Sequence, residues 1–145
     1  MISVVTPATG AELLGATVYD LALGARWAEL HAHYANEEAV VVLAGTPTLE
    51  TLDGPRDLAQ GDVVTFPRGR RGAHRIENRS DEHARVLLFS TKLMPEVVEY
   101  PERGTVFVMT EPPYGEGLHD AHEHGRILRE FRRDDGQAVP PDLGA

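Results

Sequence analysis

The stretch that decides the fold is "LHAHYANEEAVVVLAG", residues 30–45. Two histidines, His31 and His33, stand two positions apart and are followed by two glutamates and an apolar run that ends at Gly45. Residues two apart in a strand point to the same side, so the two imidazoles share a face. With a carboxylate from Glu37 or Glu38 they form a ligand set for a divalent first-row metal. On these residues alone, the alternative is an ordinary strand with a solvated polar face.

Bulk composition narrows the class of protein. The chain has 145 residues, the length of one domain, and 41% hydrophobic residues, enough for a core. A formal net charge of −9 argues against non-specific nucleic-acid binding. The absence of cysteine excludes disulfides and thiolate metal sites. Because we find neither a signal-peptide pattern nor an apolar run near the roughly 20 residues of a membrane span, we expect a cytoplasmic protein with no membrane partner.

Short runs rich in β-branched and aromatic residues alternate with glycine and proline, which is typical of an all-β sandwich or barrel. An Asp53–Gly54 pair between two such runs predicts a hairpin turn. The runs expected to form strands are 16–23, 39–45, 48–52, 62–66, 74–78, 84–90 and 105–110.

The chain is expected to form one β domain over residues 1–115 and a C-terminal tail over 116–145 that is not a separate domain. Three apolar residues of the tail have helix-like spacing and predict one short helix before an irregular end: Ile127, Leu128 and Phe131. His119 and His122 would share a face of such a helix, but exposed histidines near a chain end bind metals opportunistically.

A third imidazole lies in residues 61–78, where His74 begins a short β run. If the strands roll into a barrel, distant segments bring their inward faces together. His31, His33, a glutamate and His74 would then supply four ligands and leave coordination positions open for water or substrate. Open positions are what a catalytic metal needs.

The spacing of these residues resembles the first motif of the cupin superfamily, commonly written G-x5-H-x-H-x3,4-E-x6-G. In this chain the motif residues are Gly24, His31, His33, Glu38 and Gly45. The first glycine departs from the motif, because six residues rather than five separate it from the first histidine. The six residues between Glu38 and Gly45 favour Glu38 over Glu37 as the carboxylate ligand.

The second cupin motif, commonly G-x5-P-x-G-x2-H-x3-N, also has a counterpart. Its residues here are Gly61, Pro67, Gly69, His74 and Asn78. Four residues rather than two separate Gly69 from His74, a lengthening that falls in an expected loop. We expect Gly45 and Gly61 to bound turns with positive φ.

The resemblance spans about residues 13–93, and the chain looks most like the small single-domain cupins of bacteria. It implies a double-stranded β-helix, or jelly-roll, barrel. It also implies one divalent transition metal ion (Fe, Mn, Ni or Zn) inside one mouth of the barrel, and a homodimer. The implied metal ligands are His31, His33, Glu38 and His74.

Residues that share a face with these ligands are candidates for contact with a small-molecule substrate. In an unbroken strand Trp27 and Glu29 would lie on the side of His31. Ile76 would similarly share the face of His74. The interpretation of Trp27 as a core or interface residue is favoured over a place in the wall of the pocket.

Charged residues near the motifs suggest further roles. Arg70 and Arg71 stand just before His74 and could bind a substrate carboxylate or phosphate, although such a cluster is often a solvated loop. Glu29 and Tyr19 are candidate general bases.

The resemblance leaves the reaction open. A redox-active metal would suit a dioxygenase, and a redox-silent one would suit an isomerase or epimerase. The alternatives are a non-catalytic module that binds or senses a small molecule, and a purely structural metal.

Overall fold

A computed structural model of the chain describes residues 2–4, 10–110, 128–134 and 136–137, which form twelve strands and one short 3-10 helix. Among these residues no helix is long and apolar enough to cross a membrane. The elements are β1 (Ile2–Val4), β2 (Leu14–Leu21), β3 (Arg26–His33), β4 (Glu38–Ala44), β5 (Thr48–Thr51), β6 (Gly54–Asp57), β7 (Val63–Phe66), η1 (Arg70–Gly72), β8 (His74–Glu77), β9 (Ala84–Thr91), β10 (Glu96–Tyr100), β11 (Thr105–Met109) and β12 (Leu128–Arg132).

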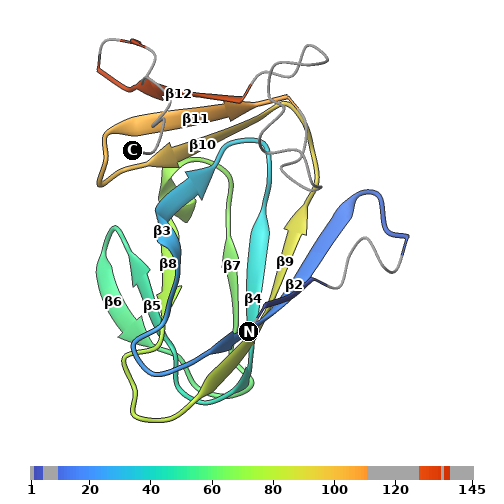
Figure 1. Cartoon of the computed structure of the whole chain (residues 1–145), viewed down its shortest axis with the longest axis vertical. Coiled ribbons are helices and arrows are strands. Elements are labelled where there is room, and N and C mark those ends of the chain that lie inside the picture. The colour runs from blue at the N-terminus through green and yellow to red at the C-terminus, as the bar shows by residue number, and fades with distance from the viewer. Residues whose placement is uncertain (1, 5–9, 111–127, 135, 138–145) are drawn as a thin grey trace, which may run out of the picture.

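The strands form two antiparallel sheets that face each other as a barrel (Figure 1). One sheet has the order β1-β2-β9-β4-β7 and the other the order β12-β11-β10-β3-β8-β5-β6. Consecutive motif strands alternate between the sheets, since β3 lies in the larger one and β4 in the smaller one. The predicted all-β, double-stranded β-helix fold is confirmed, as is the hairpin between β5 and β6.

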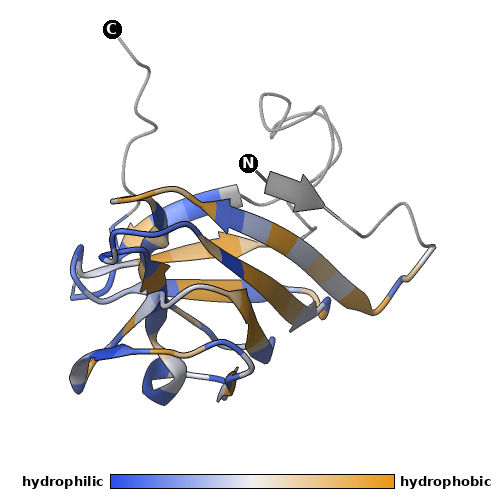
Figure 2. Cartoon of the chain, turned by 90° about the horizontal axis from the view of Figure 1, so that it is seen from below, coloured by the Kyte–Doolittle hydropathy of each residue, from blue (hydrophilic) through white to orange (hydrophobic). Residues whose placement is uncertain are grey.

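The space between the sheets is filled by apolar side chains at alternate strand positions, as a half-buried strand requires. In β9, for example, the buried and less buried residues alternate along the whole strand. Hydrophobic segments accordingly concentrate in the strands, and the connecting loops are mainly hydrophilic (Figure 2). The core cluster consists of Leu21, Val40, Val42, Leu49, Leu58, Phe66, Ile76, Ala84, Val86 and Leu88.

The prediction of a helix around Leu128 and Phe131 is wrong for the residues that the structure describes. Leu128–Arg132 forms strand β12, which pairs along its whole length with β11 at the edge of the seven-stranded sheet. Five residues are too few for a stable isolated helix, whereas an unpaired sheet edge offers each of them a backbone partner. The Glu130 side chain strengthens this pairing by binding Arg103 at 2.6 Å. His119 and His122 lie outside the described residues.

Gly45 ends β4 with φ +77°, and Gly61 has φ +92°, so both have the positive φ expected of them. Their surroundings differ. A Cβ atom on Gly45 would lie 2.5 Å from the His83 carbonyl oxygen and 2.8 Å from Ala84 Cα, whereas one on Gly61 would meet nothing within 4 Å. Only Gly45 therefore allows a close backbone crossing in addition to its turn.

We expect Gly61→Ala to lower the free energy of unfolding by about 1–2 kcal/mol, the cost of a positive φ. Gly45→Ala should lower it by at least about 3 kcal/mol, because the backbone at His83 and Ala84 must also move. Urea unfolding of the two variants beside the wild type measures both losses. Equal losses of unfolding free energy in the two variants would contradict a close backbone approach at Gly45.

Candidate metal centre

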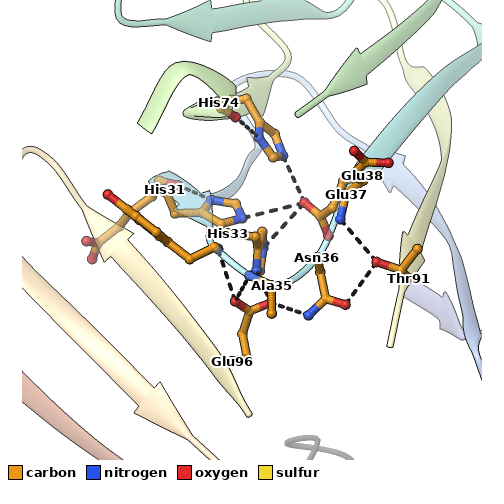
Figure 3. Close-up of polar contacts among 12 residues, drawn as sticks. His31, His33, Ala35, Asn36, Glu37, Glu38, His74, Thr91 and Glu96 are labelled. Atoms are coloured by element: carbon orange, nitrogen blue, oxygen red, sulfur yellow. Dashed lines mark hydrogen bonds and ion pairs between the residues drawn. The ribbon is translucent and has the colours of Figure 1, made fainter. Parts of the chain in front are cut away.

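Four side chains from the two sheets point toward one another inside the barrel (Figure 3). His31 and His33 lie on β3, and His74 faces His31 from the first position of β8. Glu38 comes from the opposite sheet, at the start of β4. The centre therefore joins the two sheets, and it exists only when the barrel is closed.

The Oε2 atom of Glu38 is surrounded by imidazole nitrogens, at 3.1 Å from His74 Nε2, 3.4 Å from His33 Nε2 and 3.9 Å from His31 Nε2. Ligand atoms of His31, His33 and Glu38 all lie within 4.8 Å of one another. Glu37, in contrast, is exposed, and its backbone N–H donates to Thr91 Oγ1. The structure thus brings Glu38 rather than Glu37 to the histidines.

Two buried atoms of this cluster need a partner. Glu38 Oε2 and His74 Nε2 are 3.1 Å apart, but neither atom has a hydrogen-bond partner among the described residues. Buried polar atoms are almost always satisfied, because desolvation without a partner costs free energy. A divalent cation held by Glu38 and the three Nε2 atoms would satisfy both, so these residues fit the metal that the cupin resemblance implies.

Backbone carbonyls fix the imidazoles in the orientation that a metal requires. His31 Nδ1–H donates to the Glu29 carbonyl at 2.8 Å, and His74 Nδ1–H donates to the Gly72 carbonyl at 2.9 Å. A carbonyl can only accept, so the proton of each neutral ring must be on Nδ1 and the lone pair on Nε2. Such outer hydrogen bonds set the tautomer and ring orientation of metal-binding histidines.

The protonation states of His31 and Glu38 also suit metal binding. Burial lowers the pKa of His31 to about 4, with a further contribution from the imidazoles of His74 and His33. Burial alone would raise the pKa of Glu38, but the three histidines outweigh it and leave that pKa below its usual value. At neutral pH the centre therefore offers a neutral His31 and an ionised carboxylate, the forms that bind metal.

Glu96, on β10, holds the third imidazole. Its Oε2 accepts from His33 Nδ1 at 3.3 Å, and its Oε1 accepts from the backbone N–H groups of Tyr34 at 3.1 Å and Ala35 at 3.0 Å. Asn36 Nδ2 donates to Oε2 as well. Burial opposes ionisation of Glu96, but the donors, His33 foremost, lower its pKa to about 2. Glu96 therefore ties the β3–β4 turn and His33 to β10.

Aromatic rings pack against the histidines from the core side. Phe66 stacks on His74, with ring centroids 3.6 Å apart and planes at 4°. The Trp27 ring lies 5.5 Å from His31 and 6.0 Å from His74, centroid to centroid. Trp27 thus packs against two of the imidazoles and against the core, while its interpretation as a wall of the substrate pocket stays a prediction.

The opposite side of the centre opens into a cavity of about 90 Å³. Residues lining it are His33, Asn36, Glu38, Ser90, Thr91, Lys92, Met94, Glu96 and Met109. A cavity of this size holds several water molecules or a small polar group. His33 and Glu38 are the ligands that such a group could approach.

The two predicted general bases lie elsewhere. Strand β3 contains a bulge. Three residues separate Trp27 from His31 on β3, whereas only Arg75 separates their pairing partners on β8. Ala28, inside this bulge, has φ +57°. The bulge turns Glu29 outward, where its half-exposed side chain approaches Arg103 at 3.7 Å. The expectation that Glu29 faces the site is therefore wrong. Tyr19 stands behind Trp27, at 5.0 Å between ring centroids.

None of the predicted substrate-binding residues lines the cavity, and Trp27 lies on the core side of the histidines. Ile76 shares the face of His74 but is fully buried in the core. Arg70 pairs with the buried carboxylate of Glu99. Arg71 lines a different hollow, together with Pro55 and other residues around η1. None of the three lines the cavity beside His33.

Comparison with known proteins identifies the family. A model of the cupin domain matches residues 17–90, a segment that contains all four ligand candidates. The chain is a cupin. No curated protein matches its sequence at a significant level.

Solved structures agree with this assignment. The cupin is 30% identical to a proposed sugar phosphate isomerase from Acidithiobacillus ferrooxidans, with a TM-score of 0.71 over 74% of this chain and 69% of that one. It has the fold of a sugar phosphate isomerase from Silicibacter pomeroyi (23% identity, TM-score 0.76, 99% and 83% covered). It also has the fold of the cupin domain of an XRE family transcriptional regulator from Enterobacter cloacae (21% identity, TM-score 0.52, 62% of this chain and 93% of that one covered).

Sequence reasoning missed Glu96, Phe66 and Lys92. Phe66 carries a signal in hindsight, because it ends the β run that precedes the second motif. Glu96 lies more than 60 residues from His33 in an ordinary strand, so no local pattern connects the two. Lys92 follows β9 and reaches the cavity across another strand.

We expect Glu96→Gln to weaken metal binding about 10- to 100-fold, the usual effect of removing a residue that orients a ligand. The amide keeps the size of the carboxylate but not its charge on His33. Competition with a chromophoric chelator measures the affinity. Glu99→Gln is the matched control, because Glu99 is a buried carboxylate of the same strand that contacts Tyr34 and Arg70 instead. An equal loss in both variants would contradict the specific role of Glu96.

Proposed function

We propose that this cupin is a metal-dependent enzyme of small-molecule metabolism, of the isomerase type. The observation that carries the proposal is the convergence of Glu38 and three Nε2 atoms on one point that borders an open cavity. A structural metal site is normally closed by protein ligands on all sides, whereas a catalytic one keeps a position for substrate. The proposed cofactor is one divalent transition metal ion, Fe, Mn, Ni or Zn.

Similarity to the Acidithiobacillus protein, which is itself a proposed sugar phosphate isomerase, favours isomerisation over oxygen chemistry. A bound divalent ion would act as a Lewis acid that polarises a carbonyl or hydroxyl group of the substrate. The chain's own residues hold that ion and position the substrate. His31, His74 and Glu38 are nearly fully buried, so only the His33 side of the cluster is open.

Two alternatives to an isomerase are a dioxygenase, which would hold its metal with the same ligands, and a non-catalytic sensor, which would have the same barrel. The likeness to the cupin domain of a transcriptional regulator concerns the fold alone. Within the described part of the chain, no titratable side chain lines the cavity apart from His33, Glu38, Glu96 and Lys92. A cytoplasmic location stays a prediction.

The test loads the purified protein with each candidate metal and assays aldose–ketose interconversion of three- to six-carbon sugar phosphates. We expect turnover that Glu38→Gln lowers more than about 100-fold, because the Lewis acid supplies several kcal/mol of transition-state stabilisation. Elemental analysis should show loss of the metal from the same variant. Glu37→Gln is the control. Glu37 is the exposed neighbour of Glu38, so this variant should keep both metal and activity.

The same panel separates the alternatives. Metal-dependent oxygen consumption without isomerisation would replace the proposal by a dioxygenase. Metal binding without any turnover, but with a ligand-induced rise in Tm, would favour a binding module. Absence of metal after reconstitution would overturn the metalloenzyme altogether.

We also propose that two copies associate, as the family resemblance implies. The outer face of the five-stranded sheet carries an apolar row whose members are paired in register: Val18, Leu87, Val41 and Val63. Val63 is 64% exposed, and Phe89 and Leu14 extend the same face. Contiguous exposed apolar patches of this kind mark interaction sites. A second copy could cover this face with the same residues, as a two-fold interface requires.

We expect the wild type to sediment as a dimer at micromolar concentration and Val63→Lys to shift it to monomer. A lysine within the face that the second copy covers would be desolvated without a partner. Leu52→Lys is the control, because Leu52 is also exposed, at 47%, but lies at the β5–β6 turn of the other sheet. A monomeric wild type, or dissociation by Leu52→Lys alone, would contradict this interface.

A further inference from the structure

The chain contains a single lysine, Lys92, and it lines the cavity beside the metal-ligand candidates. It is the only lysine or arginine among the described residues that do so. Every other strong cation of the chain is an arginine. Lys92 follows directly on β9, and its backbone N–H donates to the Leu13 carbonyl at 3.0 Å, which fixes the start of its side chain against β2.

Strand register places Lys92 relative to the centre. Gly15, Ser90, Glu38 and Phe66 form one row across the inner face of the five-stranded sheet, because each is paired with the next. Neighbouring strands are about 4.8 Å apart, so Gly15 lies about 10 Å from the Glu38 backbone with Ser90 between them. Phe66, at the far end, stacks on His74.

The Lys92 side chain lies in the space that Gly15 leaves open. A Cβ atom added to Gly15 would be 2.0 Å from Lys92 Cε, 2.5 Å from Nζ and 2.7 Å from Ser90 Oγ. No other residue type fits at position 15 without moving the lysine. Gly15 has no positive φ, so its backbone does not require glycine. A side chain at this position would instead have to displace the end of Lys92 and the Ser90 hydroxyl.

We propose that Lys92, held on Gly15, binds the negatively charged group of the substrate, a carboxylate or a phosphate, whose other end lies at the metal centre. That the bound molecule is a substrate rests on the proposed function. It replaces Arg70 and Arg71, which the sequence suggested for this role, because neither lines the cavity. Ser90, which lines the same cavity and whose Oγ lies 2.7 Å from a Cβ added to Gly15, supplies a hydroxyl that can donate to the same anion.

The test measures binding rather than turnover. Glycolate and methyl phosphate are titrated into metal-free and nickel-loaded protein, with ethylene glycol as the neutral probe, and calorimetry gives Kd. Lys92→Met should weaken binding of the preferred anion about 10- to 100-fold, the effect of losing a charged hydrogen bond. Lys92→Arg should retain most of the affinity. Unchanged metal content and Tm in both variants show that the fold is intact.

Gly15 provides the second, independent variant. Gly15→Ala should weaken anion binding in the wild-type background, because the methyl group displaces Lys92. It should change nothing further in the Lys92→Met background, so the two effects are not additive. Additive losses would mean that Gly15 acts on the barrel and not through Lys92.

The two anions distinguish the chemistry, because preference for glycolate indicates a carboxylate substrate and preference for methyl phosphate a phosphorylated one. The inference is overturned if the wild type binds neither anion, or if Lys92→Met binds them as well as the wild type does. Failure of the proposed function is separate: Lys92-dependent anion binding without isomerase activity would leave this site standing and remove only the reaction.

Discussion

A carboxylate buried against three imidazoles is the constraint on which the rest of this structure depends. Removing the Glu38 charge from water costs several kcal/mol, which the surrounding groups must offset. Its partners come from the opposite sheet, so the charge is compensated only when the two sheets close on each other. The unsatisfied atoms of Glu38 and His74 then leave one requirement that a cation fulfils.

That constraint explains which parts of the centre could be predicted from the sequence. His31 and His33 share a face because of strand geometry alone, and Glu38 faces inward because it alternates with the exposed Glu37. These are local relations, and the motif spacing preserves them. Glu96 could not be predicted, because its contact with His33 depends on β10 pairing with β3.

Where the backbone departs from regular geometry, local reasoning fails. Trp27 and His31 point to the same side of the sheet despite the β3 bulge. The bulge adds two residues, an even number, so side chains before and after it keep the same alternation of faces. Glu29, inside the bulge, does not obey it. Nothing in the sequence marks Ala28 for a positive φ. At the C-terminal end, the spacing of Leu128 and Phe131 suits a helix, but an available sheet edge makes it a strand.

Gly15 shows how a strand residue can be explained by what crosses it. Glycine inside a strand weakens it, and its presence signals a close approach by another group. Here that group is Lys92. A divalent ion at the centre would balance the negative charges of Glu38 and Glu96, the latter ionised at neutral pH. Among the residues that line the cavity, Lys92 then adds one positive charge, which favours an anionic ligand over a neutral one.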